Sequence, residues 1–252
     1  MKLIMAIKMF ICAKSAYKIA ALLLVCIIFF SYAKKEYSNA DFGKKFGNKA
    51  TIAKDRLQKL NESFVLCSKL CNRSSLFMQS IVFPEVMRYN SLKDGIETES
   101  LKTLYVQFGQ EYANFSIGLF QMKPSFAIEV ETKAKQLLHD SIYKELLLAY
   151  DEIDEETIRE KRIERLQDNE WQLVYLTAFI CICNETYKQK AFKGEEEKLQ
   201  WYATIYNAGF DKTNEYISKK IKQEHFYLQQ QMPKKKYAYS AIAEWYYVNN
   251  NN

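Results

Sequence analysis

The segment from Trp171 to Cys183 constrains the fold of this chain more than any other. Its sequence, WQLVYLTAFICIC, is almost entirely nonpolar and follows a strongly charged stretch, residues 151–169. A helix needs about 20 apolar residues to cross a bilayer, so this interrupted segment is too short to do so. It fits a fully buried helix in the core of a soluble domain. Only 7 glycines and 3 prolines occur in 252 residues, which also favours a mainly α fold.

Apolar residues recur at helical spacing along most of the chain. We expect helices over residues 53–78, 99–112, 124–150, 195–208 and 215–228. Pro84 should kink or divide the apolar segment 76–87, because proline disfavours the α conformation of the residue before it. The charged stretch 151–169 is predicted to be a solvated helix face with Asp154 as a cap. Residues 91–95 are predicted to form a turn.

The predicted organisation is one helical domain over residues 53–248. A polar, glycine-containing stretch at 34–52 is expected to be a flexible lead-in. The aromatic-rich segment 237–248 should pack back on the core. The run of asparagines at 249–252 is expected to be a disordered tail, as chain ends often are.

The first 33 residues have the pattern of a targeting segment. Four lysines precede an apolar run at 19–30, and Ser31-Tyr32-Ala33 places small residues where a signal peptidase cleaves. We interpret residues 1–33 as a secretory signal peptide, with an uncleaved membrane anchor as the alternative. Either interpretation predicts an exported protein of the periplasm or cell envelope, with 19–30 as the segment that would attach it to a membrane.

Charge and composition argue against several classes of function. The formal charge is +6, and removal of the four lysines in residues 1–33, which hold no acid, lowers it to +2. Such a weakly basic chain, without interleaved basic and aromatic residues, does not indicate nucleic-acid binding. No glycine-rich phosphate loop and no metal-ligand spacing is present. We therefore expect neither a cofactor nor a metal.

Four cysteines follow the targeting segment, as Cys67 and Cys71 on one predicted helix and Cys181 and Cys183 on another. In an exported protein they can form disulfides, with three pairings open. One bridge between the two helices and buried free thiols are the alternatives. A zinc site is disfavoured, because C-x-C and C-x-x-x-C are not specific zinc spacings and no histidine is near.

One stretch, from Gly118 to Ala127, combines residues that suit neither a plain helix nor a plain strand. It reads GLFQMKPSFA. Gly118 allows positive φ or close backbone approach, and Pro124 suits the first turn of a new helix. Gln121 between them carries two donors and an acceptor. The pattern predicts a turn that places one polar side chain in a cleft.

Two further features flank this turn in sequence. Glu85 lies among apolar residues at the proline of segment 76–87, where burial would raise its pKa toward the range of a neutral-pH general acid. Tyr206-Asn207-Ala208-Gly209 ends the helix predicted over 195–208, with Gly209 as a left-handed cap.

In this order the three features resemble the lysozyme-like lytic transglycosylases. That family has a catalytic glutamate near a helix end, then G-L-M-Q-x-M-P-x-T-A, then A-x-Y-N-A-G. Gly118, Leu119, Gln121, Pro124 and Ala127 match the second element in register. Phe120 and Phe126 depart from it, and the third element matches over Tyr206–Gly209. The resemblance covers about residues 75–210.

The resemblance implies a lysozyme-like helical fold and a peptidoglycan substrate. Glu85 would protonate the glycosidic oxygen between N-acetylmuramic acid and N-acetylglucosamine, then accept the proton of the muramyl 6-hydroxyl. Tyr206 and Asn207 would bind the acetamido group, while Ser116, Gly118 and Gln121 would line the glycan groove. A catalytically inactive glycan-binding or envelope-assembly protein with the same fold is the alternative.

The identity of the acid has alternatives as well. Val86 follows Glu85 where the family has serine, and the stretch between Glu85 and Gly118 is longer than usual. An inserted helix over about 91–111 would explain that length. Glu97, Glu99 and Glu111 remain candidates, although the first two fit a helix start and Glu111 fits a partner of the Gln121 turn.

Overall fold

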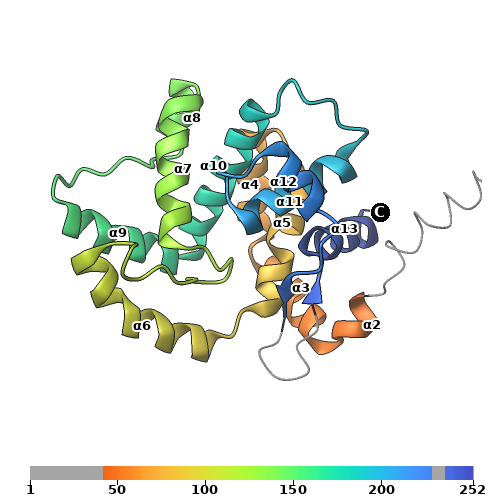
Figure 1. Ribbon diagram of the computed structural model, residues 1–252, viewed down its shortest axis with the longest axis horizontal. Coiled ribbons are helices and arrows are strands. Elements are labelled where there is room, and N and C mark those ends of the chain that lie inside the picture. Colours follow the sequence, from red (N-terminus) through yellow and green to blue (C-terminus); the bar gives the residue numbers. More distant parts are fainter. Residues whose placement is uncertain (1–41, 229–235, 252) are drawn as a thin grey trace, which may run out of the picture. The chain divides into compact units, whose positions relative to one another are not determined.

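A computed structural model of the protein describes residues 42–228 and 236–251. The targeting segment and the beginning of the predicted lead-in lie outside the described residues. The mainly α prediction is confirmed, because the described part consists of twelve helices and one two-stranded antiparallel sheet (Figure 1). No helix in this part of the chain is long and apolar enough to traverse a bilayer.

The buried helix predicted around Trp171–Cys183 is α10, Asn169–Thr186. Its first turn is capped by Asp168, whose carboxylate accepts a hydrogen bond from the Trp171 amide at 2.9 Å. Nearly every residue from 172 to 183 is buried. The helices that contact α10 include α4 (Asn61–Cys71), α7 (Pro124–Leu137), α9 (Glu155–Gln167) and α11 (Glu195–Ala208).

A second buried helix, α5 (Ser75–Arg88), carries Glu85 and runs through Pro84 without dividing. The expected division of the helix at Pro84 is therefore wrong. Proline in a helix interior costs about 3 kcal/mol. This cost is met by burial of all side chains from 77 to 87 against surrounding helices. These neighbours include α3 (Asn48–Lys59), α4, α11 and α13 (Tyr239–Asn250).

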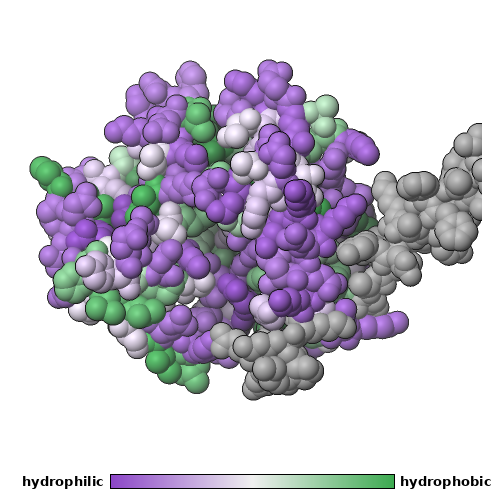
Figure 2. Space-filling view, in the orientation of Figure 1, coloured by the Kyte–Doolittle hydropathy of each residue, from purple (hydrophilic) through white to green (hydrophobic). Residues whose placement is uncertain are grey.

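Helix α9 contacts both α6 (Ser91–Phe108) and α7. The turn predicted at 91–95 is wrong, because α6 begins there with Asn90 as its cap. The exposed side chains of α6 include the apolar residues Leu92, Ile96 and Phe108. Figure 2 shows apolar surface in the region where Figure 1 places α6.

Other boundaries were predicted less well. The expected helix 53–78 is three helices, α3, α4 and α5, separated at Leu60 and at Asn72, which has φ 49°. The expected helix 124–150 ends at Leu137, and α8 (Asp140–Glu145) follows after a cap by His139. Asp154 caps α9 as predicted, accepting from the Thr157 amide at 2.8 Å.

The chain ends of the domain are more ordered than expected. Residues 42–52 of the predicted lead-in belong to α2 (Phe42–Phe46) and the start of α3, and Phe42 is buried against Trp245. Asn249 and Asn250 of the predicted tail belong to α13, which packs on the core through α5 and α11 as expected. Aromatic and helical contacts hold both segments, so their polar composition misled the prediction.

The segment after α11 also differs from the prediction. α12 spans Asn214–Lys220 only, and a hairpin follows, formed by β1 (Phe226–Tyr227) and β2 (Lys236–Tyr237). The expected helix over 215–228 therefore ends early.

The four cysteines of the helical domain are free thiols. Cys71, Cys181 and Cys183 are buried, and Cys67 is half-buried. Burial raises the pKa of the Cys71 thiol to about 11. The buried-thiol alternative is thus the one that the structure contains.

Candidate active site

The turn predicted at Gly118 is a tight hairpin held by two backbone hydrogen bonds. Ile117 and Met122 pair in both directions, at 2.8 and 3.1 Å. Gly118 has φ 68°, and a Cβ atom built there would lie 1.9 Å from Nε2 of Gln172. Both reasons for a glycine, positive φ and close approach, therefore apply. Pro124 begins α7 at its first turn, as predicted.

Gln172 on α10 holds this turn in place through hydrogen bonds to its backbone. Its side chain is fully buried. Its amide oxygen accepts from the Phe120 amide at 2.8 Å, and its amide nitrogen donates to the carbonyls of Ile117 and Leu166. The core helix thus places the turn, and Gly118 has a structural role in receiving Gln172.

Glu85 lies in the last turn of α5 and is 4% exposed. Its Oε2 lies 2.7 Å from Nη2 of Arg88, one helical turn further on. Burial raises the pKa of Glu85 from 4.5 to about 7, although Arg88, Lys123 and a hydrogen bond from Asn207 act in the opposite direction. A carboxyl group with such a pKa populates both its acid and its base form near neutral pH.

The third sequence feature meets the first two at the end of α11. The Tyr206 hydroxyl donates to the Phe120 carbonyl at 2.8 Å, which joins α11 to the turn. Burial and the nearby Glu85 carboxylate raise the pKa of Tyr206 far above its usual value. Asn207, the next residue, hydrogen-bonds Glu85 through its side chain. Glu85, the turn and Tyr206-Asn207 are thus one contact network.

The other predicted residues lie around this network with different contacts. Gln121, at φ 53°, donates to the Gly118 carbonyl at 3.0 Å and to the Asp94 carboxylate at 3.1 Å. Its amide nitrogen therefore bonds within the turn and to α6. Ser116 is half-buried and immediately precedes the paired strand residues.

The three alternative acids differ from Glu85 in burial. Glu97 and Glu99 lie exposed in the middle of α6, so their expected position at a helix start is wrong. Glu111 is exposed in the turn after α6. Since a raised carboxyl pKa needs desolvation, burial favours Glu85 among the four.

Several residues of the network are not among the predicted site residues. Lys123 lowers the pKa of Glu85, and Arg88 pairs with it. His225 contacts Asn207, with Nε2 2.7 Å from Oδ1. Arg88 is recognisable afterwards as the residue three positions from Glu85 on one helix. His225 carries no such local signal, because a helix and a hairpin entry separate it from Asn207.

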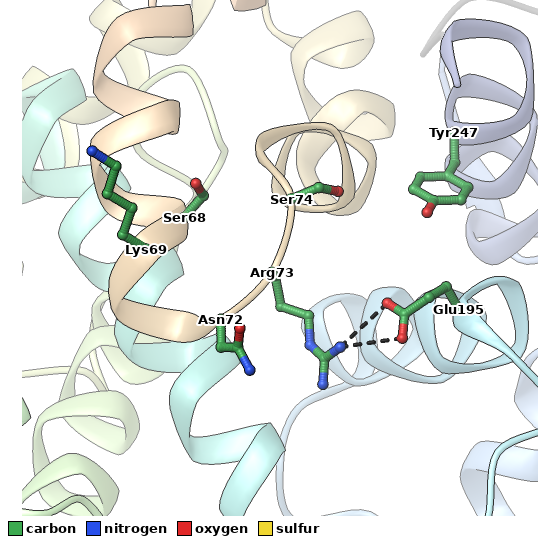
Figure 3. A pocket seen from close by; sticks show the side chains of 7 residues that line it. All are labelled: Ser68, Lys69, Asn72, Arg73, Ser74, Glu195 and Tyr247. Atoms are coloured by element: carbon green, nitrogen blue, oxygen red, sulfur yellow. Dashed lines mark hydrogen bonds and ion pairs between the residues drawn. The ribbon is translucent and has the colours of Figure 1, made fainter. Parts of the chain in front are cut away.

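A hollow elsewhere on the surface shares no residue with this network. It is lined by Ser68, Lys69, Asn72, Arg73, Ser74, Glu195 and Tyr247 (Figure 3). Arg73 and Glu195 form an ion pair across it at 3.2 Å. None of the residues that line it is both buried and titratable, so the Glu85 network remains the candidate site. Among the described residues, no group of three or more His, Cys, Asp or Glu side chains is arranged to hold a metal.

No family model matches this chain, and searches of curated proteins and of solved structures return no significant match.

Proposed function

We propose that the protein is an exported lytic transglycosylase that cleaves the glycan strands of peptidoglycan with Glu85 as its single acid and base. The observation that carries this proposal is a buried carboxyl group with a pKa of about 7 in contact with Asn207 and beside Tyr206. The ordered sequence motifs supply the substrate class by resemblance. Residues 1–33 support export, with 19–30 as the segment for membrane attachment.

In the first step, protonated Glu85 donates its proton to the glycosidic oxygen between N-acetylmuramic acid and N-acetylglucosamine. The bond from that oxygen to the muramyl C1 then breaks. In the second step, ionised Glu85 accepts the proton of the muramyl 6-hydroxyl while the oxygen of that hydroxyl bonds to C1. The product is a 1,6-anhydromuramyl end, and Glu85 regains its acid form.

The surrounding side chains suit this sequence of charges. Arg88 stabilises the carboxylate that forms when Glu85 releases its proton, and the Asn207 amide does so when its nitrogen faces Glu85. The Tyr206 hydroxyl already donates to the Phe120 carbonyl, so toward an acetamido group it can act only as an acceptor. We therefore assign it to the acetamido N–H and leave Asn207 as the residue in contact with Glu85.

Digestion of purified peptidoglycan by residues 34–252 tests the proposal. We expect release of muropeptides with anhydromuramyl ends, measured by mass spectrometry, and a rate loss of about 1,000-fold or more in Glu85→Gln. Glu111→Gln, which changes an exposed glutamate close to the turn, is the matched control and should retain the rate. Full activity in Glu85→Gln would overturn the assignment, and reducing ends would indicate lysozyme-type hydrolysis.

A second candidate is a glycan-binding or envelope-assembly protein without catalysis. The Arg88 ion pair favours it, because a cation at 2.7 Å stabilises the ionised form of Glu85 over the acid form. Binding of peptidoglycan without muropeptide release at any pH between about 5 and 8 would support this candidate over the enzyme.

A further inference from the structure

The entry to the β1–β2 hairpin contacts both side chains that pair with Glu85. His225 reaches Asn207, with Nε2 2.7 Å from Oδ1. The Arg88 guanidinium lies over the ring of the next residue, Phe226, with its central carbon 5.2 Å from the ring centroid. The His225 backbone amide donates to the Tyr237 carbonyl on the facing strand, which holds the backbone of His225 in place. This short segment therefore contacts two side chains that pair with Glu85.

Both ring nitrogens of His225 face oxygen acceptors, but a neutral ring carries only one N–H donor. Nδ1 lies 2.7 Å from the Gln223 carbonyl oxygen, and Nε2 faces the Asn207 oxygen at the same distance. Two oxygen acceptors require two N–H donors, which only the imidazolium has. Burial and the nearby Lys220 and Lys236 lower the pKa of His225 below 6.5. The ring is therefore mainly neutral at pH 7.

A neutral ring resolves this conflict by turning the amide of Asn207. The Gln223 carbonyl can only accept, so the single proton of the neutral ring stays on Nδ1. Nε2 is then an acceptor and takes a hydrogen bond from the Asn207 NH₂ group. Since the two ends of an amide are opposite in character, the Asn207 oxygen then faces Glu85. An oxygen can pair there only with a carboxyl group that carries its proton.

We propose that His225 is a positioning residue that sets the orientation of the Asn207 amide and thereby the protonation of Glu85. When neutral, it turns the Asn207 oxygen to Glu85 and favours the acid form. When protonated, it turns the Asn207 nitrogen to Glu85 and favours the carboxylate. The catalytic meaning of this coupling rests on the proposed function, but the coupling itself does not.

The other groups around the two titrating side chains supply a constant background. Arg88 and Lys123 face Glu85 as cations, and Tyr206 and Tyr239 lie beside it as hydroxyls whose pKa values burial raises. Lys220 and Lys236 face His225. Lysine, arginine and buried tyrosine keep their charge state through the neutral range. Glu85 and His225 are then the pair whose charges change there.

The test is a titration of Glu85 by carbon-13 NMR of its carboxyl group in the full domain, with the signal assigned through Glu85→Gln. We expect His225→Phe to lower the pKa of Glu85 by about one unit, because Asn207 is then free to donate to the carboxylate. His225→Gln should lower it less, since a glutamine can still hydrogen-bond Asn207 but imposes neither orientation. His139→Asn, which replaces the other histidine and keeps a helix cap, should leave the pKa unchanged.

The same titration in an Asn207→Leu background separates positioning from a general structural effect. If His225 acts through Asn207, His225→Phe should no longer shift the pKa of Glu85 in that background. An equal shift in both backgrounds would overturn the proposal, as would an unchanged or raised pKa in both His225→Phe and His225→Gln.

The titration needs no substrate, so its outcome is independent of the peptidoglycan assay. A coupling observed in a protein that releases no muropeptides would refute the proposed function alone. Muropeptide release by a protein in which Glu85 does not respond to His225 would refute the coupling alone.

Discussion

Two carboxylates, the buried Glu85 and the half-buried Glu131, show how neighbouring groups decide what a desolvated charge does. The Arg162 guanidinium donates two hydrogen bonds to Oε2 of Glu131 on α7 and one to its Oε1, at 2.8–3.1 Å. The hydroxyls of Tyr150 and Tyr175 also donate to it, at 2.7 and 2.6 Å. Glu85 has one arginine contact and one amide contact, and burial raises its pKa to about 7.

The difference is one of completeness. Glu131 has a counter-charge and enough donors for both oxygens, so its group joins α7 to α9 and α10 as an ion pair. Glu85 is taken out of water with fewer donors, so a proton replaces the missing ones near neutral pH. A fully paired carboxylate stabilises a fold, whereas an under-paired one can exchange a proton with a substrate.

Removing the arginine from each pair should show the largest contrast. Arg162→Met leaves the half-buried Glu131 without its buried counter-charge, and we expect the free energy of unfolding to fall by about 3–5 kcal/mol. Arg88→Met should cost much less at pH 6, because Glu85 can take up a proton. Chemical denaturation at pH 6 measures both. Equal losses in the two variants would break the distinction between the carboxylates.

The pH dependence of stability should sharpen the comparison. The folded state holds the Glu85 proton more tightly than the unfolded state, so the resulting stability is complete below pH 4.5 and is lost as pH rises through about 7. The loss should be about 3 kcal/mol above that range. In Glu85→Gln this contribution to the pH dependence of the free energy of unfolding should vanish. Denaturation of both proteins from pH 4.5 to 8 provides the measurement, and identical slopes would contradict the raised pKa.

A smaller effect is expected when one hydroxyl is removed from the Glu131 group. Tyr150→Phe deletes the donor at 2.7 Å but leaves Arg162 and Tyr175 in place. We expect a loss of about 1 kcal/mol in the free energy of unfolding. Tyr112→Phe, at an exposed tyrosine, is the control. A change in the rate of peptidoglycan cleavage by Tyr150→Phe would show that Glu131 is not purely structural.

Local chemistry allowed part of this fold to be predicted from the sequence. The apolar run of α10, the cap at Asp154 and the turn between Gly118 and Pro124 each depend on neighbouring residues. The division of the helix expected at Pro84 failed because burial on all sides of α5 outweighs a local preference.

The site was predictable only where a motif marked it. Glu85, Gly118 and Tyr206-Asn207 could be named in advance, and the structure brings them together. Gln172 and His225 could not, since their partners Phe120 and Asn207 are 52 and 18 residues away in sequence. Polar contacts of that range leave no periodic pattern in a single chain.

The most direct test of the account is the pH profile of muropeptide release by the wild-type protein. Cleavage needs the protonated form of Glu85, so the second-order rate should be highest below pH 7. It should fall about tenfold for each pH unit above that value. A rate that stays constant from about pH 7 to 9, or the absence of anhydromuropeptides at every pH, would contradict Glu85 as the acid.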